Sequence, residues 1–201
     1  MRRSLVVFLL CGICAPLGAQ SVDVGYQYAR SNTEDARGMH GLGARVRFSP
    51  PIDLRYDYVS ASNQRLGSFC GVFAPPSCPG PEETEFKTKL QTFSVAARLR
   101  VLSHGSFTLF ALPEIGWMMN TIERRGLTTL TMTSAHSDAP ALGLGLELAA
   151  TRIGGSAFGG WLGARFRAFA ISHPTVPALG SNPYSNLDRL GSLELGVSYG
   201  F

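Results

Sequence analysis

Polar and apolar residues alternate with a period of two in seven segments of the chain, which is the pattern of half-exposed β-strands. The clearest example runs over 22–28, where Val22, Val24, Tyr26 and Tyr28 alternate with small or polar residues. The other six segments lie at about 42–48, 52–58, 87–102, 142–148, 158–167 and 192–201. The pattern predicts an all-β chain whose strands have one apolar face and one small or polar face.

An eighth strand is predicted at 107–119, although its alternation is imperfect. The odd positions are mostly apolar, but the even positions combine Glu114 and Gly116 with large apolar residues. Pro113 also removes one hydrogen bond from the ladder between strands. We expect a bulge or local distortion at Pro113.

The connections between these segments alternate in length along the chain. The short ones lie at about 49–51, 103–106 and 154–156. The long, polar ones lie at about 32–39, 61–85, 121–139 and 173–189. This order predicts an antiparallel up-and-down meander of eight strands. Outer-membrane barrels have tight periplasmic turns and longer extracellular loops, so we expect both termini on the side of the short turns.

The apolar face must point either into a soluble barrel or out to lipid. The interior of an eight-stranded barrel is only just wide enough for ordinary side chains, and here the polar face is the small, glycine-rich one. Phe107 and Trp117 share one face of the fifth strand. At about 3.3 Å per residue and a tilt of about 40°, they are roughly 25 Å apart along the barrel axis, the height of a lipid-facing band. We therefore predict an all-β, eight-stranded antiparallel up-and-down transmembrane β-barrel.

The face predicted to point inward carries charges of both signs. A buried charge without a partner is costly, so a near balance favours a closed, salt-bridged interior over an open channel. The predicted interior ion network comprises Asp23, Arg45, Arg47, Asp53, Arg55, Asp57, Arg98, Arg100, Glu114, Glu147, Arg165, Arg167 and Glu194.

Residues 1–19 have the character of a secretory signal peptide. Two arginines precede an apolar run at 5–14, and small residues lead to a cleavage site between Ala19 and Gln20. The alternative, a membrane-anchoring helix, would need about twenty apolar residues. We expect the barrel domain to comprise 20–201.

Only two cysteines remain in that domain, Cys70 and Cys78. Export implies an oxidising compartment, so a local disulfide is the favoured interpretation. It would either protect a long surface loop from proteases or shape a contact site for another surface molecule.

Few other features point to chemistry. Removing Arg2 and Arg3 lowers the formal charge from +4 to +2, which is too small and scattered to indicate nucleic-acid binding. The histidines have no metal-ligand spacing, and nothing calls for a cofactor or a catalytic residue. His136, Ser137 and Asp138 combine suitable types for catalysis, but neighbours in an extended chain point to opposite faces. A lipid A deacylase-like enzyme at the outer rim therefore stays a minor alternative.

The end of the chain supplies a resemblance. Residues 193–201 alternate up to Tyr199 and a terminal Phe201, and this resembles the C-terminal strand by which outer-membrane barrels are recognised for assembly. With the signal and eight segments, the chain resembles the small OmpA/OmpX-type outer-membrane barrels, in its barrel portion only. The resemblance implies an integral outer-membrane location, periplasmic termini, and lipid and the barrel-assembly machinery as partners.

The resemblance indicates fold and location more strongly than function. We expect a non-enzymatic monomer that acts through its long extracellular loops in structural or surface-interaction roles, with an extracellular ligand at the loops. The alternative is a narrow passive pore, if the interior ion pairs rearrange.

Overall fold

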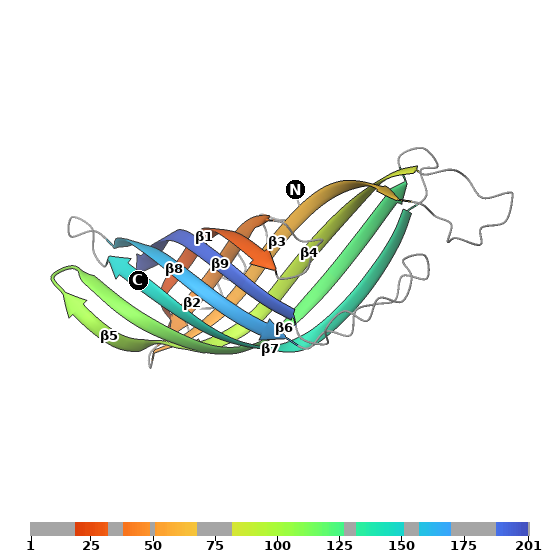
Figure 1. The fold of residues 1–201 in the computed structure, drawn as a ribbon. Helices are drawn as coiled ribbons and strands as arrows, with labels where there is room; N and C mark the ends of the chain where they lie inside the picture. The colour runs from red at the N-terminus through yellow and green to blue at the C-terminus, as the bar shows by residue number, and fades with distance from the viewer. Residues whose placement is uncertain are drawn as a thin grey trace, which may run out of the picture.

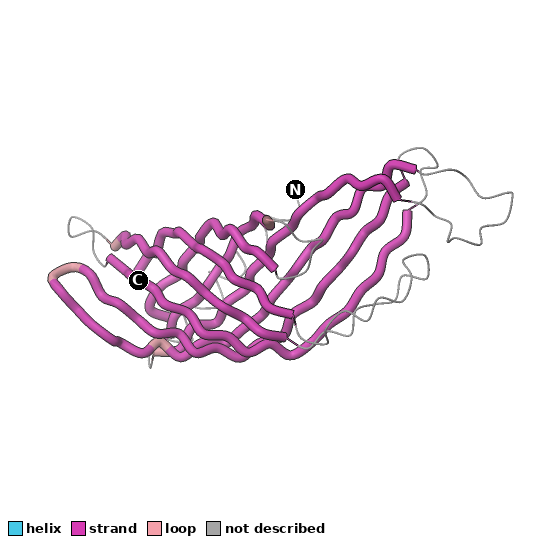
Figure 2. The backbone as a smooth tube through the Cα atoms, viewed as in Figure 1, coloured by secondary structure: helices cyan, strands magenta, loops and turns pink. Residues whose placement is uncertain are grey.

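The computed structural model describes residues 19–31, 38–48, 51–67, 82–126, 132–150, 157–169 and 188–200, which form strands and turns (Figures 1 and 2). The strands are β1 (Ala19–Ser31), β2 (Met39–Phe48), β3 (Ile52–Gly67), β4 (Glu82–Ala97), β5 (Leu99–His104), β6 (Phe107–Gly126), β7 (Met132–Ala150), β8 (Phe158–Phe169) and β9 (Asp188–Gly200). No helix in this described part of the chain has the length and apolar character of a membrane span.

The strands close into one barrel. Strands that follow one another in sequence pair antiparallel, except β4 and β5, which do not pair with each other. In addition, β1 pairs with β9, and β4 pairs directly with β6. Strands β4 and β5 together form one strand of the barrel, interrupted at Arg98, so the barrel has eight strands. The predicted fold class, an eight-stranded antiparallel up-and-down transmembrane β-barrel, is confirmed.

The two faces of the barrel wall have opposite chemistry. Large apolar side chains such as Leu142 (65% exposed) and Val197 (62%) cover the outside, whereas Asp23 (0%) and Glu147 (1%) are buried in the lumen. Phe107 and Trp117 both point outward from β6, as predicted. The apolar surface therefore faces lipid, and the charged residues are enclosed.

The expected distortion at Pro113 lies on one side of β6 only. Pro113 pairs with Leu144 of β7 without any shift of register. On the other side the ladder breaks, because Arg98 leaves the strand and donates its backbone N–H to the carbonyl of Pro51 at 2.8 Å. Since proline has no N–H to offer a neighbouring strand, the break lies beside the one residue of β6 that lacks a backbone donor.

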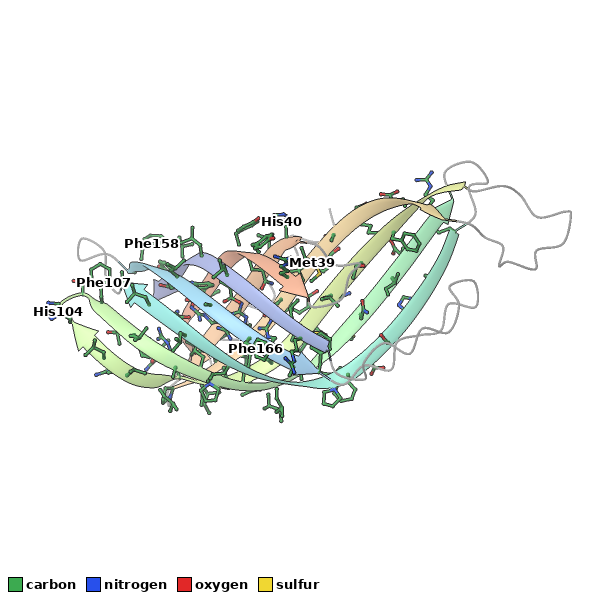
Figure 3. All side chains as sticks on the ribbon, in the orientation of Figure 1. Met39, His40, His104, Phe107, Phe158 and Phe166 are labelled. Atoms are coloured by element: carbon green, nitrogen blue, oxygen red, sulfur yellow. The ribbon has the colours of Figure 1, made fainter. Side chains whose placement is uncertain are left out.

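Beyond this break, β5 and the start of β6 form a hairpin at the short-turn end of the barrel (Figure 1). Its turn contains Gly105, whose φ of 57° lies in the left-handed region that glycine adopts without steric cost. His104 and Phe107 flank the turn (Figure 3).

Strands β3, β4, β6 and β7 continue well past the other strands at the opposite end, where the long connections lie (Figure 1). We call this four-stranded projection the extension. The predicted bounds of the long connections at 61–85 and 121–139 are wrong, because parts of both ranges are strand. Strand β3 pairs with β4 as far as Gly67, and β6 pairs with β7 as far as Arg125. Both faces of these strand ends are largely polar, so the period-two hydrophobic signal disappears while the backbone pairing continues.

Several predictions concern residues outside the described part of the chain. Residues 1–18, Cys70, Cys78 and Phe201 all fall there. The signal peptide, the disulfide and the terminal part of the assembly signal stay predictions.

Candidate functional site

The lumen holds twelve of the thirteen residues predicted for the interior ion network. They form two groups, and among the described residues no ion pair joins one group to the other. The Glu147 cluster consists of Asp23, Arg45, Arg47, Asp53, Arg98 and Glu147. The Glu114 cluster consists of Arg55, Asp57, Glu114, Arg165, Arg167 and Glu194. Each contains three arginines and three carboxylates, so each is formally neutral.

The Glu114 cluster is a closed ring in which arginines and carboxylates alternate. Every arginine bridges two carboxylates, and every carboxylate receives two arginines. In order around the ring, the nitrogen–oxygen distances are 2.6 Å for Asp57–Arg55, 2.7 Å for Arg55–Glu194, 3.0 Å for Glu194–Arg165, 2.6 Å for Arg165–Glu114 and 2.6 Å for Arg167–Asp57, and Glu114 also contacts Arg167. The ring pairs every charge and satisfies nearly all of its hydrogen-bonding groups, as buried ions require.

The local sequence explains how this ring fits inside a narrow barrel. Arg165 and Arg167 are two residues apart on β8, so both point into the lumen. Gly143 lies opposite Glu114 on β7, and a Cβ atom there would collide with the Glu114 side chain. Ser94 donates a hydrogen bond to Glu114 Oε2 at 3.4 Å. Small and hydroxyl residues therefore make room for the long side chains.

The Glu147 cluster converges on one carboxylate. Glu147 accepts contacts from three arginines: Arg45, Arg47 Nη2 at 3.4 Å, and Arg98 Nη2 at 2.8 Å. Arg45 and Arg47 also share Asp23, with 2.5 Å between Arg47 Nη2 and Asp23 Oδ2. Arg98 has no second carboxylate among the described residues. The cluster is therefore a smaller ring of Arg45, Asp23, Arg47 and Glu147, from which Arg98 and Asp53 branch.

Asp53 is the weakest member of the Glu147 cluster. Its nearest charged group is Arg45 Nη1, 3.7 Å from Asp53 Oδ2, and neither carboxylate oxygen has a hydrogen-bond partner among the described residues. Four other buried atoms of the same cluster also have no such partner: Asp23 Oδ1, Arg45 Nη2, Arg47 Nε and Arg98 Nε. In the Glu114 cluster one buried atom, Arg55 Nη1, has no hydrogen-bond partner among the described residues.

An apolar wall replaces polar partners on one side of the Glu147 cluster. It consists of Phe110, Leu112, Ala149 and Trp161. The guanidinium carbon of Arg45 lies 4.3 Å from the centre of the Trp161 ring, and that of Arg98 lies 3.6 Å from the centre of the Phe110 ring. These cation–π contacts bind the arginines without giving their N–H groups an acceptor.

Trp161 fits inside the barrel because two neighbouring strands carry glycine where its ring lies. A Cβ atom at Gly25 of β1 or at Gly196 of β9 would approach the indole more closely than real Cβ contacts do. The two glycines therefore provide the space that the Trp161 ring occupies.

A second apolar group closes the lumen on the side of the long connections. It consists of Ala29, Met39, Val59, Leu90, Met118, Ala139, Ala141, Phe169 and Leu190. Neither this cap nor the apolar wall was predicted. The available signal was the presence of Phe110, Leu112 and Met118 at inward positions of the fifth segment.

Arg100 does not belong to the network, and its predicted inward position is wrong. It lies exposed in β5, where the register shifts between Arg100 and Leu102. The pairing of β3 with the fourth barrel strand begins at Ile52 and Ala97, so no complete barrel surrounds Arg100. Without it, the two clusters contain equal numbers of arginines and carboxylates.

The structure separates the three residues considered for catalysis. On β7, His136 and Asp138 are exposed on the outer face, whereas Ser137 points to the opposite face. His136 Nδ1 contacts the Thr121 hydroxyl at 3.0 Å, and Asp138 Oδ2 accepts the Trp117 indole N–H at 3.0 Å. In the described part of the chain no group of histidines, cysteines or carboxylates is arranged to hold a metal ion.

The fold is similar to solved outer-membrane barrels. Neisserial surface protein A from Neisseria is 14% identical, with a TM-score of 0.54 over 90% of this chain and 96% of that protein. A major outer membrane protein from Thermus thermophilus is 14% identical, with a TM-score of 0.52 over 91% of this chain and 100% of that protein. No protein-family model and no curated protein matches the sequence. Fold and lipid-facing surface thus define a small β-barrel membrane protein, of the architecture found in OmpA/OmpX-type barrels.

Proposed function

We propose that this protein is a non-enzymatic, monomeric outer-membrane barrel that acts on the outside of the cell, in structural or surface-interaction roles. The observation that carries this proposal is the filled lumen, in which two neutral ion clusters lie beside an apolar wall and below an apolar cap. A filled lumen leaves the lipid-facing surface and the two ends of the barrel as places for function.

The closed interior is tested by conductance. Folded protein reconstituted in a planar bilayer should give no ion current, because the clusters and the cap block the axis. Steady single-channel steps would contradict the closed interior and favour a narrow passive pore. An Arg98→Gln, Phe110→Ala variant loosens the side-chain packing of the lumen at the short-turn end only. It serves as a control for how sensitive the conductance assay is to such loosening.

The termini are proposed to lie in the periplasm, so that the extension projects outside the cell. Lys87 and Lys89 are the only lysines in the sequence, and both lie on β4 within the extension. A membrane-impermeant amine reagent applied to intact cells should therefore label these two positions and spare the amino terminus. The reverse pattern, found by peptide mapping, would overturn the orientation.

The extension supports an interaction role because both of its edges are open among the described residues. Residues 61–67 of β3 pair only with β4, and residues 132–140 of β7 pair only with β6. Open strand edges offer unpaired backbone groups to other chains. The predicted Cys70–Cys78 disulfide would lie in the connection at the tip of this projection.

A lipid-modifying enzyme is the competing function. His136 and Ser137 lie on opposite faces of β7, which opposes a shared catalytic site. The mass profile of lipid A should be the same with and without expression of the protein. A shift in lipid A mass that disappears in a His136→Gln variant would contradict the non-enzymatic proposal.

Tyr199 and Phe201 are proposed to form the signal read by the barrel-assembly machinery. Tyr199 faces outward from β9, and its ring lies 5.2 Å from that of Phe158. Deleting Phe201 should reduce the amount of heat-modifiable protein in the outer-membrane fraction, whereas a Phe158→Leu variant, which keeps the terminal residue, should assemble at the normal level.

A further inference from the structure

Strand β5 has one open backbone edge at the short-turn end of the barrel. It pairs with β6 alone, and the ladder between β3 and the fourth barrel strand begins at Ile52 and Ala97. Arg98 donates its N–H to Pro51, and beyond this bond the described part of the chain has no backbone pairing on that side. Residues 99–104 therefore present unpaired N–H and C=O groups, which form a template for a further strand.

The hairpin that carries this edge has two different faces. All six residues of β5 are exposed. Arg100 pairs with Phe110 and Leu102 pairs with Leu109, and residues directly opposite each other share a face of the sheet. Leu102 therefore points outward, as Phe107 does, whereas Arg100 lies on the face that continues the lumen wall. The hairpin projects past the other strands at this end of the barrel (Figure 1).

The open edge lies at the membrane surface and not in the hydrocarbon. Backbone groups without a partner are not tolerated among lipid chains, and a charged side chain there is costly. Arg100 is exposed, and its side chain has no hydrogen bond or ion pair with another described residue. Leu102 and Phe107 give the hairpin an apolar side that faces lipid. The edge is therefore at head-group level, where a partner can reach it from the aqueous side.

The hairpin has positive charge and no negative charge. Residues 97–113 include Arg98, Arg100 and His104 but no Asp or Glu. Arg98 is already paired with Glu147, so the guanidinium group of Arg100 is the charge that a partner can use. Opposite charges on adjacent strands are stabilising. A strand added to β5 is thus favoured when it has a carboxylate near Arg100.

We infer that β5 pairs with an extended segment of a periplasmic protein, in which apolar residues alternate with carboxylates. An added strand gains main-chain hydrogen bonds, and its alternate side chains give specificity. The apolar side chains of the segment continue the outward face beside Leu102, and a carboxylate lies across from Arg100. This inference goes beyond the proposed function, which concerns the outside of the cell. The periplasmic location of the partner rests on the proposed orientation, but the contact itself does not.

The test measures peptide binding by the folded protein in lipid nanodiscs. The probe is a short fluorescent peptide that alternates leucine with glutamate, and its anisotropy is followed as the protein concentration rises. Empty nanodiscs give the blank for partition of the peptide into lipid. We expect saturable binding to the wild-type protein, and binding no stronger than that to empty nanodiscs would overturn the inference.

Backbone methylation tests whether the peptide binds as a strand. Methyl groups on alternate peptide nitrogens block one edge of an extended peptide and leave the other edge free. Of the two alternating patterns, one should abolish binding and the other should preserve it, because only one edge of the peptide faces β5. Equal binding of the two methylated peptides would overturn strand addition.

Substitutions at Arg100 test the charge of the partner. Arg100→Gln should weaken binding of the glutamate peptide about fivefold, the size of one exposed charge–charge contact. Arg100→Glu should reverse the preference, so that a matched leucine–lysine peptide binds better than the glutamate peptide. An unchanged preference for the glutamate peptide in Arg100→Glu would overturn the assignment of an acidic partner.

The matched controls are Arg125→Gln and Arg125→Glu, which make the same changes at an exposed position of β6 in the extension. They should bind both peptides like the wild type, and heat-modifiable gel mobility checks that all four variants are folded. Equal effects at Arg100 and Arg125 would show a general response to net charge and overturn the site. The lysine-labelling experiment tests the orientation separately, so failure of the strand pairing and failure of the proposed topology give different results.

Discussion

The two ion clusters in the lumen have the same composition but different connectivity. In the Glu114 cluster each of the six residues contacts two of opposite charge, and the contacts close into a ring. In the Glu147 cluster three arginines converge on one carboxylate, and Asp53 has a single contact at 3.7 Å. The same charges are thus almost fully satisfied in one part of the lumen and poorly satisfied in the other.

The surroundings of each cluster explain this difference. Serine and glycine from neighbouring strands surround the ring and supply space or hydrogen bonds, as Ser94 and Ser192 do. The Glu147 cluster instead borders on Phe110 and Trp161, which offer π-faces but no acceptors. The comparison teaches that charge balance decides whether a lumen can close, whereas the neighbouring uncharged residues decide how well its ions are paired.

The largest effect is expected from Glu147→Gln. This change leaves Arg98 without a carboxylate partner among the described residues and weakens two further arginines. Removing one partner of a buried ion pair costs about 3–5 kcal/mol, and we expect a loss of that size in the free energy of unfolding. Urea titration of the folded barrel in detergent measures it. An added Arg98→Gln change should restore part of the loss, and no restoration would argue against the branched arrangement.

A smaller effect is expected from Glu114→Gln. The ring would open into a chain, but Arg165 would keep Glu194 and Arg167 would keep Asp57. The expected loss is about 1.5–3 kcal/mol, the range for hydrogen bonds to charged groups, measured by the same titration. A loss as large as that of Glu147→Gln would show that closure of the ring gives no advantage.

Gly196→Ala tests the apolar wall beside the Glu147 cluster. The added methyl group would collide with the Trp161 ring and the Val24 carbonyl oxygen, and overpacking of this kind costs about 1–3 kcal/mol. Gly191→Ala is the matched control on the same strand, because its Cβ would have no atom closer than 4.0 Å. Comparable losses in the two variants would mean that Trp161 does not pack against β9 as described.

The smallest effect is expected from Asp53→Asn. The Asp53 carboxylate is buried without a hydrogen-bond partner among the described residues, so its neutralisation also removes a desolvated charge. We expect the free energy of unfolding to change by less than about 1 kcal/mol. A loss of several kcal/mol in the urea titration would show that Asp53 is a full member of its cluster.

The barrel could be predicted from sequence because each strand passes between two environments of opposite polarity. Residues that alternate between lipid and an ionic lumen carry a strong period-two signal. That signal fails at 61–67 and 132–138, where the strands leave both environments and become polar on both faces. It misleads at Arg100, where the alternation continues although β3 no longer provides a neighbouring wall.

The division of the charges into two clusters lay beyond sequence analysis for a different reason. Arg45 and Arg55 are direct partners on β2 and β3, yet they belong to different clusters. Which carboxylate each reaches depends on the register of strands on the far side of the barrel. Alternation along one strand contains no information about that register.

Several ion pairs connect strands that are not neighbours in the wall. Arg45 on β2 reaches Glu147 on β7, and Arg55 on β3 reaches Glu194 on β9. Hydrogen bonds between adjacent strands fix the circumference of the cylinder, but they do not prevent it from flattening into an ellipse. Contacts across the diameter oppose that deformation, and most strongly in the Glu114 cluster, because satisfied polar networks are rigid. The barrel should therefore keep its cross-section under lateral pressure from the bilayer.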